Sequence, residues 1–451
     1  MLHSTSVLRL WLVILSCLCF FWMAGSGGSF AQEGMLGEFE MPSSINPVGS
    51  GARALGMGGG FIAVADDATA ASWNPGGLVQ LETPEISAVG AWFHRTEDNT
   101  FGTHPEASGA QESTNTNLNY LSAVYPFSWL NRNMVVSLNY QHLYDFSRDW
   151  SLKAYSKTDE TATQKISFEE QGSLSAIGLA YAVQVTPKVS FGLTLNFWED
   201  SLTDNEWKAS SKWETSGVDD GIAYTITNSD KENFSFSGFN ANLGLLWNVN
   251  THLTLGAVLK TPFTADIDYD RTSTYSVTYP LYPEYNVPAD SREAGESREL
   301  DMPLSYGIGA AYRFSDVLTI SADIYRTVWD DFVLKDADGN KTSPITNKPA
   351  SQSNVEPTHQ VRVGAEYLYI TGTYVFPFRC GAFYDPKPAE GSPDNYYGIS
   401  LGSGIVREKI VFDAVYQYRF GQDVGANILE DYDFSQDVSE HTVYASVIFH
   451  F

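Results

Sequence analysis

Two short patterns in the chain have the residue types that catalysis or metal binding requires. Gly398-Ile-Ser-Leu-Gly402 has the Gly-x-Ser-x-Gly spacing of a nucleophilic serine, which needs a strand, a sharp turn and a helix. Ser400 instead lies within a continuously alternating segment, which favours a strand with small residues on one face. Asp336–Asn340 begins like a calcium loop but lacks the glutamate at its twelfth position, which favours a polar hairpin turn. The eight histidines have no metal-ligand spacing. We therefore predict no catalytic residue, no metal and no cofactor.

A set of arginines occupies the polar faces of alternating segments: Arg313, Arg362, Arg379 and Arg419. One interpretation is that an arginine binds a ligand carboxylate, and Arg313, Arg362 and Arg379 are the candidates. The other is a lattice of ion pairs between neighbouring strands, because Asp323, Glu366 and Asp413 occupy the same faces.

The segments that carry these residues alternate apolar and polar side chains with a period of two. In His441–Phe451 one face holds Val443, Ala445, Val447, Phe449 and Phe451. Strands of about ten residues with aromatic residues near their ends are typical of a transmembrane β-barrel. The alternative is a soluble sandwich, whose strands are usually shorter and whose apolar faces point inward.

The whole chain predicts an all-β fold, an antiparallel transmembrane barrel of about fourteen strands. The strands are centred near Ala88, Ser122, Leu138, Gly178, Leu193, Leu243, Leu255, Ile308, Ile320, Val363, Phe378, Leu401, Val415 and Val447. Short turns alternate with long connections, and the long connections are predicted to be loops at Arg95–Asn117, Asp149–Gln164, Glu199–Asn233, Ala265–Glu299, Arg326–Pro357, Pro386–Asp394 and Gln422–Glu440. Many of the Asp and Glu residues fall in these loops. Both chain ends lie on the short-turn side.

Composition and the N-terminus place the protein outside the cytoplasm. The 451-residue chain has a formal net charge of -27, which argues against nucleic acid as a partner. Residues 1–31 read as a signal peptide, with Arg9 before an apolar run and cleavage before Gln32. A lipoprotein site at Cys17 is the alternative. After cleavage only Cys380 remains, so no disulfide forms within the chain.

One stretch, Gly51–Leu78, does not alternate. It contains a glycine cluster, an acidic pair, an alanine-rich turn of helix and the turn Asn74-Pro75-Gly76-Gly77. Small-residue stripes on two predicted strands, Gly398/Ser400/Gly402/Gly404 and Ser305/Gly307/Gly309/Ala311, leave room inside a barrel. We therefore predict a hatch at residues 32–84 that plugs the lumen of a barrel at residues 85–451.

Gly51–Leu78, with Ala-Asp-Asp-Ala and Trp-Asn-Pro-Gly-Gly-Leu, resembles the N-terminal hatch of the FadL/TodX family of outer-membrane transporters. These proteins carry long-chain fatty acids and aromatic hydrocarbons through a fourteen-stranded barrel. The family turn is Asn-Pro-Ala, and Gly76 replaces its alanine here. Phe451 looks like the C-terminal signal for assembly into the outer membrane.

The resemblance implies passive uptake of a hydrophobic small molecule, which meets the hatch and leaves through the barrel wall into outer-membrane lipid. It implies a monomer that is not an enzyme. Asn74, Pro75 and Gly76 would form a hatch hinge, or else a rigid turn that only ends a helix. The alternative function is that of a structural or interaction barrel, such as a shuttle protein of type IX secretion.

Overall fold

The protein is described by a computed structural model that covers residues 41–46, 48–155, 162–219, 221–426, 428–429 and 432–451. Fourteen antiparallel strands form a closed barrel, because the last strand pairs with the first from Glu85↔His450 to Phe101↔Phe434. These strands are β1 (Glu85–Phe101), β2 (Gly109–Trp129), β3 (Arg132–Asp145), β5 (Thr163–Thr186), β6 (Val189–Trp198), β8 (Ile222–Asn248), β9 (Leu253–Lys260), β12 (Ser305–Ser315), β13 (Leu318–Thr327), β16 (Thr358–Thr371), β17 (Tyr374–Tyr384), β18 (Tyr396–Arg407), β19 (Ile410–Val424) and β20 (Phe434–His450). The predicted fold class is confirmed, and each predicted strand centre falls in one of these strands. The predicted signal peptide lies outside the described residues.

The outer face of the barrel is apolar. Exposed apolar side chains on strands around the barrel are Leu121, Leu138, Leu179, Leu245, Ile308, Ile324, Val363, Leu401 and Val447. Exposed aromatic residues flank this band on both sides, with Trp92, Phe197, Phe239 and Tyr397 toward the long connections and Trp129, Trp247, Phe314 and Phe449 toward the short turns. An apolar band between aromatic girdles is the surface that a bilayer requires, and it excludes the soluble sandwich.

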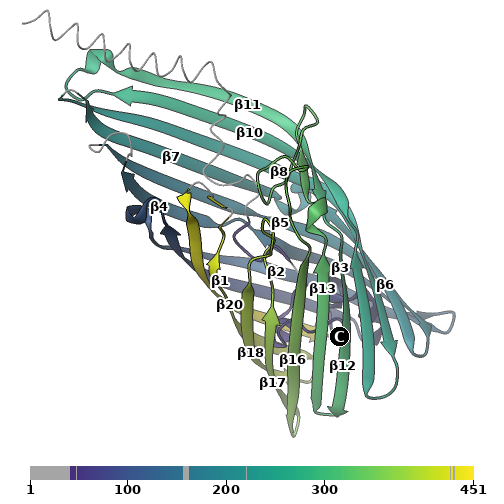
Figure 1. Cartoon of the computed structure of the whole chain (residues 1–451). Helices are drawn as coiled ribbons and strands as arrows, with labels where there is room; N and C mark the ends of the chain where they lie inside the picture. Colours follow the sequence, from purple (N-terminus) through teal and green to yellow (C-terminus); the bar gives the residue numbers. More distant parts are fainter. Residues whose placement is uncertain (1–40, 47, 156–161, 220, 427, 430–431) are drawn as a thin grey trace, which may run out of the picture.

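A second sheet extends the barrel on the side of the long connections. Its order is β4-β5-β7-β8-β10-β11-β14-β15, and it shares the long strands β5 and β8 with the barrel. The added strands are β4 (Arg148–Tyr155), β7 (Glu206–Asp219), β10 (Phe263–Thr278), β11 (Val287–Met302), β14 (Val333–Lys335) and β15 (Lys341–Thr342). Figure 1 shows this extension rising obliquely from one side of the barrel, at the upper left.

The prediction that these connections are loops is therefore wrong for most of their length. The acidic stretch Asp266, Asp268 and Asp270 lies on β10, where it alternates with the buried residues Ile267 and Tyr269. The alternation is a strand signal with its apolar face turned inward and its acids in water. Asp336–Asn340 is the polar hairpin turn between β14 and β15, where both carboxylate oxygens of Asp336 accept from Asn340.

The described residues before β1 form no strand. They contain α2 (Ala52–Gly56), α3 (Ala70–Trp73) and the 3-10 helix η1 (Pro75–Gln80). Four other short helices lie in the connections, η2 (Pro105–Ala107), α4 (Asp200–Thr203), η3 (Pro283–Tyr285) and η4 (Trp329–Asp331). Within the described ranges, no helix has the length and apolar character to cross a membrane.

Candidate functional site

Residues 48–84, which we call the plug, lie inside the barrel. Their backbone is held by inward-facing side chains from strands around the whole circumference. Asp323 of β13 accepts the N–H groups of Phe61 and Ile62 at 2.6 and 2.8 Å. Further bonds come from Tyr120 and Ser122 of β2, Ser190 and Thr194 of β6, and Ser400 of β18. Contacts on opposite walls fix the plug across the lumen.

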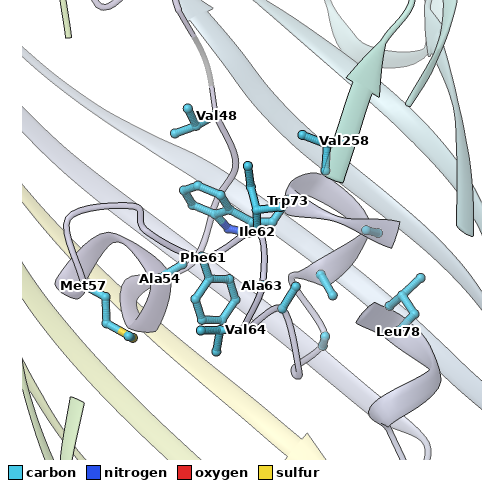
Figure 2. Packing of buried hydrophobic residues seen from close by; sticks show 14 of the residues in the cluster. Val48, Ala54, Met57, Phe61, Ile62, Ala63, Val64, Trp73, Leu78 and Val258 are labelled. Atoms are coloured by element: carbon cyan, nitrogen blue, oxygen red, sulfur yellow. The ribbon is translucent and has the colours of Figure 1, made fainter. Parts of the chain in front are cut away.

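The plug has its own apolar core, which Figure 2 shows. Phe61 and Trp73 meet edge to face with ring centroids 5.8 Å apart, and both are buried. The indole N–H of Trp73 donates to the carbonyl of Ser50 at 2.6 Å, so the one polar atom of this ring is satisfied. The same cluster includes Val258 of β9. A core shared with the wall makes the plug a packed unit of the barrel.

Glycines on the wall give the plug its space. A Cβ atom on Gly364 of β16 would lie 2.0 Å from the carbonyl oxygen of Met57. A Cβ atom on Gly192 of β6 would lie 2.2 Å from the carbonyl carbon of Pro75. No side chain fits at either position, so plug and wall meet backbone to backbone. Ser400 contacts Gly56 and Gly58, as the predicted small stripe on β18 requires.

The turn Asn74-Pro75-Gly76 is anchored to the wall. The Asn74 carboxamide accepts from Gly76 N at 3.0 Å and donates to the carbonyls of Ile62 and Leu245, at 2.8 and 3.0 Å. Asn74 thereby caps η1, whose first residue is Pro75. The Ser190 hydroxyl donates to the Gly76 carbonyl. This geometry is that of a rigid joint, and its role as a hinge stays a prediction.

Arg379 belongs to an ion-pair network below α2. Its guanidinium contacts Glu366 of β16 and Asp413 of β19, each at 2.6 Å. Arg53 of the plug contacts the same Glu366 at 2.9 Å and Asp66 at 2.5 Å. Arg379 is buried and fully engaged by two carboxylates, which favours the lattice over a ligand site at this position.

The structure does not bring the three candidate arginines together. Arg362 contacts Asp385 at 3.5 Å and Gly58 O at 3.2 Å, and it lines a lumen cavity. Arg313 is exposed near the short-turn end of β12. Of the three candidates, Arg362 is the one that borders a cavity in the lumen.

Residues 41–46, which we call the strap, cross the lumen above the plug. Ser44 donates to Asp385 and Asn46 donates to Pro386 O, each at 2.7 Å. The carbonyls of Met41 and Pro42 accept from Lys387, at 3.1 Å, and from Arg95. Both ends of the strap are therefore tied to the wall by polar contacts.

Two narrow cavities flank the strap, and both are lined by Asn46 and Val48. One holds about 60 Å³ beneath an aromatic roof that includes Trp198 and Trp329. The other holds about 160 Å³ beside Arg362. Pockets for drug-sized ligands hold roughly 300–1,000 Å³. A larger ligand therefore needs the strap to move.

The barrel wall has a window between β2 and β3. Their pairing begins at Trp129↔Arg132 and ends at Tyr120↔Gln141, although β2 continues to Gly109. Beyond this point β3 shifts register against β5 at His142/Tyr144, and β4 continues along β5. The far end of the window is closed where Gln111 bonds to the Ser151 backbone.

The window holds a groove of about 600 Å³, which Asn115 crosses by donating to Asp145 and, at 3.4 Å, to Ser147. Asn117, His142 and Asp145 line both this groove and the 160 Å³ cavity. It opens near Leu118, the last exposed apolar residue of β2, beyond which Thr116, Thr114 and Glu112 face outward. The window therefore lies at the border between the apolar band and the polar extension.

Residues 45–447 match the family model for outer membrane transport proteins of the OMPP1/FadL/TodX type. The chain belongs to this family. It is therefore an outer-membrane β-barrel transport protein, and the resemblance carried by Gly51–Leu78 is confirmed. The family and its solved members are transport channels, not enzymes.

Solved structures share the fold at low sequence identity. A FadL homologue from Pseudomonas aeruginosa is 15% identical, with a TM-score of 0.61, over 89% of this chain and 98% of that one. The toluene transporter TodX from Pseudomonas putida is 13% identical, with a TM-score of 0.55, over 90% and 100%. The monoaromatic hydrocarbon channel CymD is 16% identical, with a TM-score of 0.52, over 90% and 98%. No curated protein sequence matches the chain.

The sequence did not reveal the window, the strap or two cations of the lumen. Lys260 ends β9 and donates to Val48 O at 2.9 Å, and Arg95 of β1 contacts Glu440 at 2.7 Å. Arg95 lies on the inward face of an alternating segment, so its pattern could have placed it with the other arginines. The window depends on where two strands stop pairing, which no local pattern records.

Proposed function

We propose that the protein takes up hydrophobic small molecules passively into the barrel lumen. The molecules then leave sideways into the outer membrane, through the window between β2 and β3. The observation that carries this proposal is that the same three residues, Asn117, His142 and Asp145, line both the groove and the lumen cavity. A plug fixed to opposite walls closes the axial route, so the ligand would leave by a lateral route.

Movement of the strap would admit the ligand. The strap separates the two lumen cavities. It is held by hydrogen bonds to Asp385, Pro386 and Arg95 and by the burial of Met41 and Ile45 in an apolar cluster. Such bonds exchange with water at a modest net cost of about 1 kcal/mol each. The strap buries two apolar residues, whereas most of the apolar residues of the plug lie in its core, so the strap is the easier element to displace. Long-chain fatty acids and aromatic hydrocarbons are the proposed ligands.

The single-chain barrel closes on itself, which supports action as a monomer. The family match favours transport over the alternative of a secretion shuttle. Neither a catalytic step nor a cofactor enters this proposal.

Uptake by cells that lack their own transporter tests the proposal. Expression of the full chain should raise the initial uptake rate of labelled fatty acid or toluene above that of cells with an empty vector. The protein must be shown in the outer membrane by heat-modifiable migration. Normal assembly with no gain in uptake of either ligand would contradict the proposal.

A further inference from the structure

The window is strongly acidic, although the lumen beside it is not. Five carboxylates line the groove, from Glu112, Asp145, Asp149, Glu169 and Glu170, against the single guanidinium of Arg148. Glu112, Asp149 and Glu169 are exposed, and none of the ion pairs between described residues involves them. The rim of the groove therefore carries negative charge that the described wall does not neutralise.

Apart from Asp145, the carboxylates that line the lumen cavity are paired. Arg419 contacts Asp385 at 3.1 Å and Glu440 at 3.0 Å, and Arg362 also contacts Asp385. Glu440 has a second partner in Arg95. Paired charges cancel beyond a few ångströms, whereas unpaired charges at the mouth of a cleft act on an approaching ligand. Charge selection would therefore take place at the window.

An inner residue of the groove also requires a donor. The carboxamide nitrogen of Asn117 lies 3.4 Å from His142 Nε2, but the carboxamide oxygen of Asn117 is enclosed and has no hydrogen-bond partner among the described residues. An enclosed acceptor without a partner is unfavourable. Rotation of the Asn117 side chain into the groove would let a ligand hydroxyl donate to this oxygen, and would place the oxygen dipole beside an ammonium group. A carboxylate offers it nothing.

We infer that the window selects neutral and cationic amphiphiles over anionic ones. This inference rests on the proposed lateral route and narrows its ligands to molecules that carry no negative charge. A fatty acid would then pass in its protonated form, because its anion meets the acidic rim. The preference is electrostatic, so it must weaken with salt.

Three probes that share one fluorescent dodecyl chain test the inference, with trimethylammonium, hydroxyl and carboxylate end groups. Their association rates are measured by stopped flow with the full barrel in nanodiscs of zwitterionic lipid at pH 8, after subtraction of empty nanodiscs. At about 10 mM salt the ammonium probe should associate about tenfold faster than the carboxylate probe, with the alcohol between them. At about 1 M salt the ratio should approach one, because the Debye length falls from about 30 Å to about 3 Å.

A window variant and a matched control locate the effect. Glu112→Gln/Asp149→Asn/Glu169→Gln should abolish the preference. Asp266→Asn/Asp268→Asn/Asp270→Asn removes the same charge from β10, on the far side of the extension, and should leave the preference intact. Equal rates for the ammonium and carboxylate probes, or a preference that survives in the window variant, would overturn the inference alone. Association of none of the probes above empty nanodiscs would overturn the proposed function with it.

Discussion

At the scale of single residues, Asn74 joins the plug to the barrel. Its one carboxamide caps η1, holds the loop at Ile62 and reaches Leu245 on the wall. A single side chain with three partners in three segments fixes their relative positions, and Pro75 fixes the backbone that follows. The joint is therefore a point where a small change should loosen the plug without touching a strand.

We expect Asn74→Ala to impair uptake while the barrel still assembles, because the buried carbonyl of Ile62 loses its donor at a cost of about 1–3 kcal/mol and the bond to Leu245 on the wall is lost. Pro75→Ala should act in the same direction but more weakly. It should lower stability by about 0.4–1 kcal/mol, because it mainly increases the conformational entropy of the unfolded chain. Uptake rate and heat-modifiable migration check both. Pro280→Ala, in an exposed hairpin tip, is the control. Parental uptake in Asn74→Ala would reduce the turn to scaffolding.

At the scale of elements, the barrel strands could be predicted because lipid imposes a local pattern. Ile308 and Leu401 face outward and their neighbours inward, so the sequence of each strand alternates with a period of two. The strands of the extension were missed because their polar residues face water. Asp266-Ile-Asp-Tyr-Asp270 alternates as regularly as any barrel strand, yet its acids suggested a loop. The small stripes predicted that something fills the lumen, but not which backbone atoms meet which glycine.

The glycines that face the plug give a test at this scale. We expect Gly364→Val and Gly192→Val to displace the plug, because each new side chain would overlap the backbone at Met57 or Pro75. Single-channel conductance in planar bilayers should rise in both variants. Gly90→Val is the matched control, since nothing lies within 4 Å of a Cβ atom at Gly90. Unchanged conductance in both plug-facing variants would mean that the plug does not close the axial route.

At the scale of the whole molecule, the chain combines a sealed axis with an open side. The plug contacts opposite walls, the strap lies above it, and the ladder between β2 and β3 stops part-way up the barrel. In the proposed function, this arrangement directs a ligand from the lumen to the border of the membrane. The central claim is therefore that the window is the route.

Locking the window tests this claim most directly. In a Cys380→Ser background, Asn115→Cys and Ser147→Cys place thiols on facing sides of the window, where the parent side chains lie 3.4 Å apart. A short, reducible crosslinker that reacts with both thiols should abolish uptake of labelled ligand. Reduction of the crosslinker should restore uptake. The control pair Ser128→Cys/Asn133→Cys bridges the same two strands at the short-turn end and should leave uptake unchanged. Uptake at the parental rate with the window bridged would contradict the account.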